Sequence, residues 1–253
     1  MIRTILTENA WIKLQDILRR IGCYLTDNSR NTFEGILWRL RTGAPWRDLP
    51  AEFGPWYSIY RRYNRWNKNG KVDEILENVE GIIDYRTVYL DGTYVPVHQH
   101  ATGAAPKGTD QATGISRAGL TTKIHAAVDR KGHPVQFEVT GGNISDIKQA
   151  EIMIDDLAPM FNELIADKGY DSDSFRIELM TEGCSPVIPV KSNSDRPNPG
   201  FHKTKYKNRH RVENIFARLK HLRSIAMRFD KLKVMYEGNV KLGLIIIWLG
   251  LKV

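Results

Sequence analysis

Four residues with chemically useful side chains recur at helical spacing in the segment YKNRHRVENIFARLK. Tyr206, Arg209, Glu213 and Lys220 lie at offsets of zero, three, seven and fourteen residues. At about 100° per residue, an α-helix would place all four within a sector of about 60°. A lone carboxylate would then lie among a phenol, a guanidinium and an ammonium. Such a set favours a metal-dependent phosphodiester site, because Mg²⁺ prefers hard oxygen ligands and DNA phosphates bind arginine and lysine.

Two further acids follow apolar stretches that have the composition of buried strands. Asp91 lies in YLDGTYV and Asp167 in LIADKGY. A carboxylate at the end of a buried strand is costly unless a cation or several donors accompany it. Each acid has a structural alternative, because Asp91-Gly92 is a common turn signature and Asp167 is suited to capping a helix. If Asp91, Asp167 and Glu213 converge, their mutual repulsion requires a divalent cation between them.

The elements that would position these acids alternate in type after residue 84. Two predicted strands, Arg86–Val95 and Glu163–Ala166, each contain or run into one of the acids. Two more, Thr122–Asp129 and Pro134–Thr140, are joined by a short turn as a hairpin. The remaining predicted elements are helices over Asp146–Leu157, Ser172–Thr181 and Tyr236–Leu249 and a strand over Ser185–Val190. This mixture predicts an α/β fold in which helices pack on a mixed sheet.

Residues 1–84 have the pattern of a small helical bundle. Thr7 and Asn31 are the predicted N-caps of its first two helices. A later helix, WYSIYRRYNRWNK, places its aromatic residues on one face. Its other face carries the basic residues Arg61, Arg62, Arg65 and Lys68. Small bundles with one basic helix often insert that helix into the major groove of DNA, so we expect these four residues to contact DNA. The alternative is an ordinary solvated face.

Positive charge is concentrated between Phe201 and Lys233. The whole chain has 253 residues and a formal net charge of +8. In this one stretch, eleven lysines and arginines stand against two acids, Glu213 and Asp230. A local field of this kind attracts polyanions, nucleic acid above all, although a solvated basic face is again the alternative. Further candidates for contacts with the DNA backbone are Arg228 and Lys231.

The sequence offers neither a disulfide framework nor a membrane-spanning segment. Cys23 and Cys184 are far apart and have no zinc-site spacing, which fits a reducing cytosol. The N-terminus lacks the anatomy of a signal peptide. The apolar run Leu242–Leu251 has about half the length that a bilayer span needs, so it predicts a buried terminal helix. We therefore expect a cytoplasmic protein, associated with the nucleoid, that has no membrane partner.

The chain resembles the bacterial insertion-sequence transposases. Its Tyr206, Arg209, Glu213 and Lys220 match their Tyr-x2-Arg-x3-Glu-x6-Lys signature at all four defined positions. LDGTYV and IADKGYDS resemble the first and second catalytic blocks of these proteins. GILWRLRTGAPWRDLPAEFGPW, GLTTKIHAAVD and HRVENIFARLKHLRSIAMRFDK are similar to the insertion-sequence-five family, so that the likeness runs from about residue 30 to 249. GISRAG departs from the expected Gly-x-Ser-Arg-Gly-Gly form of this family.

The resemblance implies a fold, a reaction and a set of partners. It implies an RNase H-like domain over residues 85–253, preceded by the helical DNA-binding domain at 1–84. Its catalytic and metal-binding triad would be Asp91, Asp167 and Glu213, holding two Mg²⁺ or Mn²⁺ ions. Tyr206, Arg209 and Lys220 would assist on the DNA strand. The partners would be transposon terminal inverted repeats, target DNA and further copies of the chain, as a homodimer or a higher oligomer. The alternatives are a stand-alone RNase H-like endonuclease and a catalytically silent DNA-binding regulator.

Overall fold

The computed structural model describes residues 3–103, 109–191, 197–198 and 201–252. The chain divides into two compact units. The first comprises Met1–Gly81, Val97–Gln111 and Arg218–Val253, and the second comprises Ile82–Pro96 and Ala112–Ala217. Each unit therefore contains segments that are distant in the sequence.

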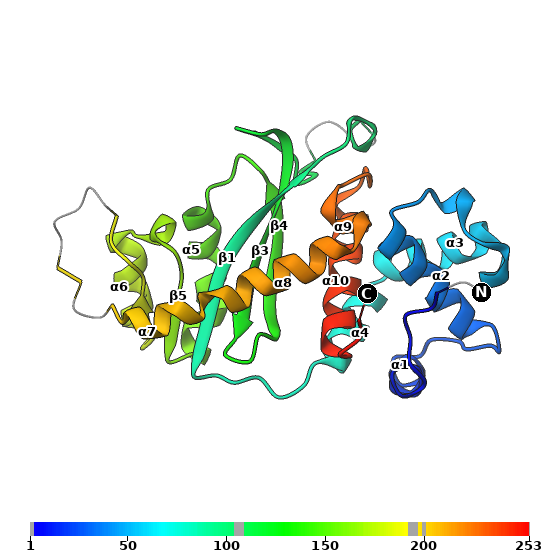
Figure 1. Ribbon diagram of the computed structural model, residues 1–253, viewed down its shortest axis with the longest axis horizontal. Coiled ribbons are helices and arrows are strands. Elements are labelled where there is room, and N and C mark those ends of the chain that lie inside the picture. Colours follow the sequence, from blue (N-terminus) through cyan, green and yellow to red (C-terminus); the bar gives the residue numbers. More distant parts are fainter. Residues whose placement is uncertain (1–2, 104–108, 192–196, 199–200, 253) are drawn as a thin grey trace. The chain divides into compact units, whose positions relative to one another are not determined.

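The second unit contains a mixed six-stranded sheet (Figure 1). Its strands are β1 (Thr87–Pro96), β2 (Gly114–Ser116), β3 (Gly119–Asp129), β4 (Pro134–Gly141), β5 (Glu163–Ile165) and β6 (Ser185–Val187). The order is β2-β3-β1-β5-β6, and β4 also pairs with β3. β1 is antiparallel to β3 but parallel to β5, and β5 is parallel to β6. The predicted hairpin is β3–β4, and the predicted α/β class with helices around a mixed sheet is confirmed.

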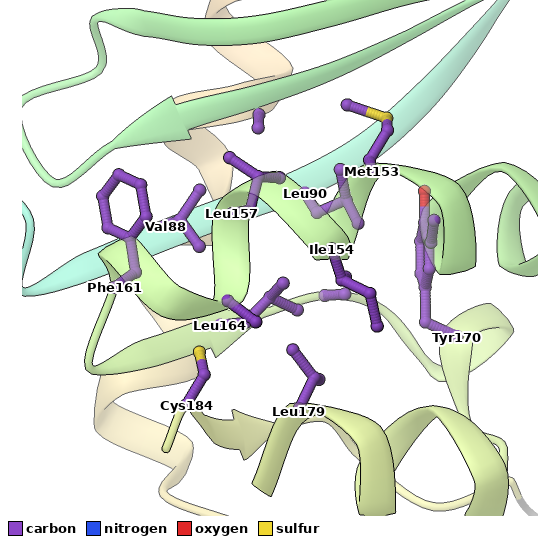
Figure 2. Packing of buried hydrophobic residues seen from close by; sticks show 14 of the residues in the cluster. Val88, Leu90, Met153, Ile154, Leu157, Phe161, Leu164, Tyr170, Leu179 and Cys184 are labelled. Carbon is purple, nitrogen blue, oxygen red and sulfur yellow. The ribbon is translucent and has the colours of Figure 1, made fainter. Parts of the chain in front are cut away.

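Side-chain alternation along β1 separates a hydrophobic face from the face that carries Asp91. Val88 and Leu90 are buried in a cluster with residues of α5 (Asp146–Leu157) and α6 (Asp173–Thr181). Figure 2 shows Met153, Ile154 and Leu157 of α5 packed over these two strand residues. Burying a side chain such as Leu90 contributes about 1.5–3 kcal/mol, so this cluster anchors the strand that bears Asp91.

The other face of β1 meets the segment that carries the Tyr206 motif. Arg209 and Arg211 belong to this segment, and they contact Asp91 and Tyr89 of β1 respectively. The segment comprises α7 (Lys203–Tyr206), a 3₁₀ turn (Lys207–Arg209) and α8 (His210–His221). Figure 1 shows α8 running across β1 and β3. The division between the two units falls within α8, after Ala217.

The first unit is helical. Its helices are α1 (Glu8–Arg20), α2 (Ser29–Thr42), α3 (Trp56–Lys68), α4 (Lys71–Val79), α9 (Arg223–Ala226) and α10 (Lys233–Trp248). The Thr7 hydroxyl accepts a hydrogen bond from the Ala10 amide at 3.3 Å, as expected of an N-cap. Asn31 is not a cap, because α2 begins at Ser29 after Asn28. Gly43 ends α2 with a φ of 68°, a conformation that glycine adopts without strain.

The C-terminal helix is buried in this helical unit. Tyr63 of α3 donates a hydrogen bond to Asn239 of α10 at 2.8 Å. Val97 and Arg228 form a β-bridge, so Val97–Gln111 also lies in this unit. The apolar run of α10 is a core helix, as predicted. Among the described residues, none of the helices has the length and apolar character that crossing a membrane requires.

Candidate active site

The Tyr206 motif is folded in three pieces where the sequence predicts one continuous α-helix. Tyr206 ends α7, Arg209 ends the 3₁₀ turn, and Glu213 lies in the first turn of α8. Where the turn meets α8, Nδ1 of His210 lies 2.9 Å from the carbonyl oxygen of Lys207, so that carbonyl has a side-chain partner. The expected grouping survives this change: the Arg209 guanidinium lies 5.9 Å from the centre of the Tyr206 ring.

Asp91 of β1 and Asp167, which follows β5, are at matching positions along two neighbouring parallel strands. In the parallel pairing of β1 with β5, Tyr89 is opposite Ile165, so a further step of two residues along both chains reaches Asp91 and Asp167. An even number of residues also returns each side chain to the same face of the sheet. Asp167 caps the turn that follows, because its carboxylate accepts a hydrogen bond from the Gly169 amide at 2.7 Å. Asp167 therefore does cap this turn, as the structural alternative proposed. Capping does not prevent it from lying near Asp91.

Arg209 joins the first and third acids of the predicted triad. Its Nη1 lies 2.7 Å from Oδ2 of Asp91, and its Nη2 forms an ion pair with Oε1 of Glu213. The side chains of Asp91 and Arg209 are 18% and 20% exposed, whereas that of Glu213 is 52% exposed. The guanidinium is therefore largely shielded from water, and Glu213 is the accessible member of the group.

Burial and charge act in opposite directions on Asp91. Burial raises the pKa of Asp91, and the nearby Asp167 carboxylate raises it further. The Gly92 amide, which donates to Oδ1 of Asp91 at 2.8 Å, and the Arg209 guanidinium oppose that increase in pKa. Burial alone would lower the pKa of Arg209, but the carboxylates of Asp91 and Glu213 raise it overall. Asp91 thus depends on a neighbouring cation to remain ionised in its partly dry position.

The three acids have the chemistry of a divalent-cation site, but Arg209 now supplies their counter-charge. Within the described part of the chain, no three acidic, histidine or cysteine side chains lie close enough together to hold one ion as they stand. Asp91, Asp167 and Glu213 nevertheless offer hard oxygen ligands around a single positive group, and such ligands suit Mg²⁺ or Mn²⁺. A cation bound by these acids would take over the role of the guanidinium.

The structure places the other predicted DNA contacts as follows. Lys220 is exposed on α8, seven residues after Glu213 and therefore near the same side of the helix. Lys231 is exposed, and so is the basic face of α3, where Arg62 alone is half-buried. That face comprises Arg61, Arg62, Arg65 and Lys68.

The prediction that Arg228 contacts the DNA backbone is wrong, because its side chain is buried. It is 0% exposed, and its Nε donates to the carbonyl oxygen of Asp230 at 3.0 Å. Its guanidinium lies 5.2 Å from the centre of the Tyr236 ring. Arg228 is therefore a structural residue of the helical unit.

Sequence reasoning missed a basic hollow on the face of β1 that carries Asp91. The cavity has a volume of about 340 Å³, and its lining includes the basic residues Arg86, Arg130 and Lys205 with Tyr89. It also includes one acid, Glu163, which forms an ion pair with Lys205. Tyr89 lies two residues before Asp91, so the two side chains share a face of β1. Neither Arg86 nor Arg130 belongs to the motif, and only the fold brings them to this face. The only sequence pattern that could have pointed to the hollow is the alternation along β1, which puts Tyr89 and Asp91 on one face.

Comparisons with known proteins match two parts of the chain to family models. A family model described as "Transposase DDE domain" matches residues 83–246, and one described as "Putative transposase of IS4/5 family" matches residues 6–76. A putative transposase for insertion sequence element IS6501 from Brucella ovis is 34% identical over 131 residues, which are 51% of this chain and 99% of that relative. A putative transposase for insertion sequence element IS402 from Burkholderia cepacia is 31% identical over 148 residues, which are 54% of this chain and 66% of that relative.

A likeness in fold extends to a much more distant solved structure. The cryo-EM structure of the piggyBac transposase synaptic complex with hairpin DNA superposes with a TM-score of 0.57 at 10% sequence identity. The match covers 97% of this chain and 72% of that chain. At this level of identity, the similarity concerns the fold of the polypeptide.

Proposed function

This chain belongs to the DDE-domain transposases of insertion sequences, and we propose that Asp91, Asp167 and Glu213 are its catalytic acids. The observation that carries the proposal is the contact of Asp91 and Glu213 with the same Arg209 guanidinium, together with the place of Asp167 at the end of the strand next to β1. Membership of the family implies dependence on divalent metal. The finer assignment, two Mg²⁺ or Mn²⁺ ions held by these three residues, is part of the proposal.

The side chains of the motif change partners when DNA and ions bind. Asp91, Asp167 and Glu213 would hold and orient the divalent ions. When bound, these ions would supply the Lewis acidity that phosphodiester cleavage requires. Arg209, released from Asp91 and Glu213, binds a phosphate of the strand as a planar bidentate donor. Tyr206 lies beside Arg209 and supports it against the strand end, while Lys220 binds a neighbouring phosphate.

The DNA partners follow from the charge of the described surfaces. The basic residues of α3 bind the terminal inverted repeats. The hollow that Arg86, Arg130 and Lys205 line binds the backbone of the strand beyond Asp91. Strand cleavage and joining to target DNA then take place in the cytoplasm, at the nucleoid, in a homodimer or a higher oligomer of the chain.

The experiment that tests the triad measures DNA binding and DNA cleavage separately. Asp91→Asn, Asp167→Asn and Glu213→Gln should each abolish cleavage of terminal-repeat DNA and leave its binding in a gel-shift assay nearly unchanged. The matched control is Asp155→Asn, which neutralises an exposed acid on α5. If any of the three variants cleaves at a rate close to that of the wild type in Mg²⁺, that residue is not a catalytic acid.

A strand-transfer assay with precut ends separates the transposase from the two alternatives drawn from the sequence. A stand-alone endonuclease cuts but does not join precut ends to target DNA. A silent regulator binds terminal repeats and does neither. Joining that requires all three acids supports the proposal, whereas joining without them rules it out.

A further inference from the structure

The short segment between α9 and α10 exposes every second residue. Met227, Phe229 and Lys231 are exposed, whereas Arg228 is buried and Asp230 is half-buried. Met227 has the dihedral angles of an extended chain, with a φ of −138° and a ψ of 128°. Side chains of an extended chain point alternately to opposite sides. The segment therefore has an inward face of two charged residues and an outward face that carries a thioether, an aromatic ring and an ammonium.

The inward face anchors the segment in the helical unit. The buried guanidinium of Arg228 lies 5.2 Å from the centre of the Tyr236 ring. Oδ1 of Asp230 lies 3.3 Å from Nη2 of Arg39, and Oδ2 of Asp230 accepts a hydrogen bond from Nδ2 of Asn239 at 2.7 Å. Because these contacts reach two different helices, α2 and α10, they fix the backbone that carries the outward side chains.

The ring of Phe229 is stacked on the ring of His98. The two ring centres are 4.5 Å apart, and the ring planes differ by 28°. Backbone pairing brings the rings together, because Val97 forms a β-bridge with Arg228 and the His98 amide donates to the Arg228 carbonyl oxygen at 2.9 Å. Nδ1 of His98 accepts from the His100 amide at 3.2 Å, which orients the imidazole. One side of the Phe229 ring is thus supported by a second ring that is itself held in place.

A large part of this supported ring is nevertheless open to solvent. Phe229 is 41% exposed, and Met227 on the same face of the segment is 39% exposed. The surroundings are basic, because Lys231 is exposed two residues further on and eleven lysines and arginines lie between Phe201 and Lys233. A ligand that matches both properties has a flat apolar face and a negative charge. Nucleotides combine these properties, since every base has a π-face and every phosphate an anionic charge.

We propose that Phe229 is a stacking platform for an unpaired base of the DNA substrate, and that Lys231 binds the phosphate next to that base. Bases inside a duplex are covered by their neighbours, so only an unpaired strand or an opened end offers a free face. The platform does not select sequence, because stacking is available to all four bases. The inference rests on the proposed function in taking DNA as the substrate, but it does not depend on the three acids.

The test separates contacts with bases from contacts with the backbone. The full chain is titrated, in EDTA, against fluorescent single-stranded oligothymidylate and against an abasic strand of the same length. Fluorescence anisotropy measures both affinities. We expect the wild type to bind oligothymidylate more tightly than the abasic strand. Phe229→Ala should weaken binding of oligothymidylate about tenfold, within the range for one lost base–aromatic stack, and leave the abasic strand unaffected. Equal losses on both strands, or no loss on either, would overturn the proposal.

Two variants serve as controls for Phe229→Ala. Tyr24→Ala removes another exposed aromatic ring of the helical unit, one that is 81% exposed and lies between α1 and α2, and should leave both affinities unchanged. Lys231→Ala should weaken binding to both strands alike and reduce the slope of log affinity against log salt by about 0.7, the contribution of one phosphate contact on a single strand. An unchanged slope would overturn the role of Lys231.

Conservative variants keep the test independent of folding. Phe229→Tyr keeps the ring and should keep the preference for oligothymidylate, whereas Phe229→Leu keeps an apolar side chain and should lose it. This pair decides if Phe229→Ala does not fold, because neither variant leaves a void beside His98 as large as alanine does. A Phe229→Leu protein that binds oligothymidylate as tightly as the wild type would mean that apolar contact suffices, and would overturn stacking.

Catalysis provides a separate readout. Asp91→Asn should bind both strands as the wild type does, because it leaves the helical unit unchanged. If Asp91→Asn still cleaves terminal-repeat DNA, the catalytic assignment fails whatever Phe229 does. If the triad variants lose cleavage but Phe229→Ala does not distinguish the two strands, only the stacking platform fails.

Discussion

Nη1 of Arg209 lies 2.7 Å from Oδ2 of Asp91, although 118 residues separate the two in the sequence. The same guanidinium pairs with Glu213 on the next helix. Arg209 thus supplies positive charge to both carboxylates. If these acids hold divalent ions, as proposed, the ions compete with this guanidinium for the same carboxylates.

Removing Arg209 should therefore strengthen ion binding and weaken DNA processing. We expect Arg209→Gln to bind Mn²⁺ more tightly than the wild type in the absence of DNA, because the competing guanidinium is gone. Cleavage should nevertheless fall by about two orders of magnitude, because a donor to the strand phosphate is lost. Isothermal titration calorimetry and a cleavage assay on the same preparation measure the two effects.

Arg218→Gln is the control for Arg209→Gln, because Arg218 is an exposed arginine further along α8. It removes the same charge without touching Asp91. Weaker Mn²⁺ binding by Arg209→Gln than by this control would contradict competition and would indicate that Arg209 supports the ion site.

The space that Gly92 leaves for Asp146 predicts a specific non-additive effect. In Gly92→Ala, the new Cβ would lie 2.3 Å from Oδ1 of Asp146, so the carboxylate must turn away from its Lys123 partner. We expect a loss of about 1–3 kcal/mol in the free energy of unfolding, as for other overpacked sites. Urea unfolding of the single and double variants measures this loss.

The double variant Gly92→Ala/Asp146→Ala locates the clash. If the methyl group collides with Asp146, the double variant is more stable than the sum of the two single effects allows. Strict additivity would place the strain elsewhere, for example in the strand pairing of Gly92 with His125.

The buried His125 predicts sensitivity to acid. Burial lowers the pKa of His125 from 6.5 to about 4; the nearby Asp146 opposes this shift, while Lys123 adds to it. Because the folded-state pKa is lower than the unfolded one, the unfolded chain takes up the proton first as the pH falls. The contribution of His125 to the free energy of unfolding is therefore fully present above pH 6.5. It declines as the pH falls towards 4, by on the order of 3 kcal/mol in total.

Urea unfolding across that pH range tests the acid sensitivity with His125→Gln. The variant should show a shallower decline in stability than the wild type, since it has no imidazole to protonate. His202→Gln, at an exposed position, controls for the loss of an imidazole alone. Parallel declines in the wild type and in His125→Gln would show that another group governs acid unfolding.

Lys220 and Arg228 are both basic residues of the same stretch, and the structure predicts different consequences of removing them. Lys220 is exposed, so Lys220→Ala should reduce the slope of log affinity against log salt by about one, the contribution of one phosphate contact. Arg228 is fully buried, so Arg228→Ala should instead cost on the order of 3 kcal/mol of stability. Salt titrations of DNA binding and urea unfolding measure these two outcomes. An unchanged salt slope in Lys220→Ala, or a reduced slope with unchanged stability in Arg228→Ala, would contradict them.

Much of the fold could be predicted because its signals are local. The cap at Thr7, the left-handed glycine that ends α2 and the strand alternation along β1 each depend on a few consecutive residues. The predicted helix Asp146–Leu157 agrees with α5 at both ends. The failures are local as well: a 3₁₀ turn interrupts the Tyr206 motif where side-chain spacing alone predicts one helix.

The three candidate acids were also predicted from the sequence, because the prediction needs only their residue types, their spacing and the apolar stretches before Asp91 and Asp167. Only the tertiary structure decided which charges meet. It paired Arg209 with Asp91, buried Lys123 against Asp146, and enclosed Arg228 in the helical unit. Local periodicity arises from backbone geometry within a few residues, whereas desolvation and ion pairing depend on side chains brought together from segments far apart in the chain.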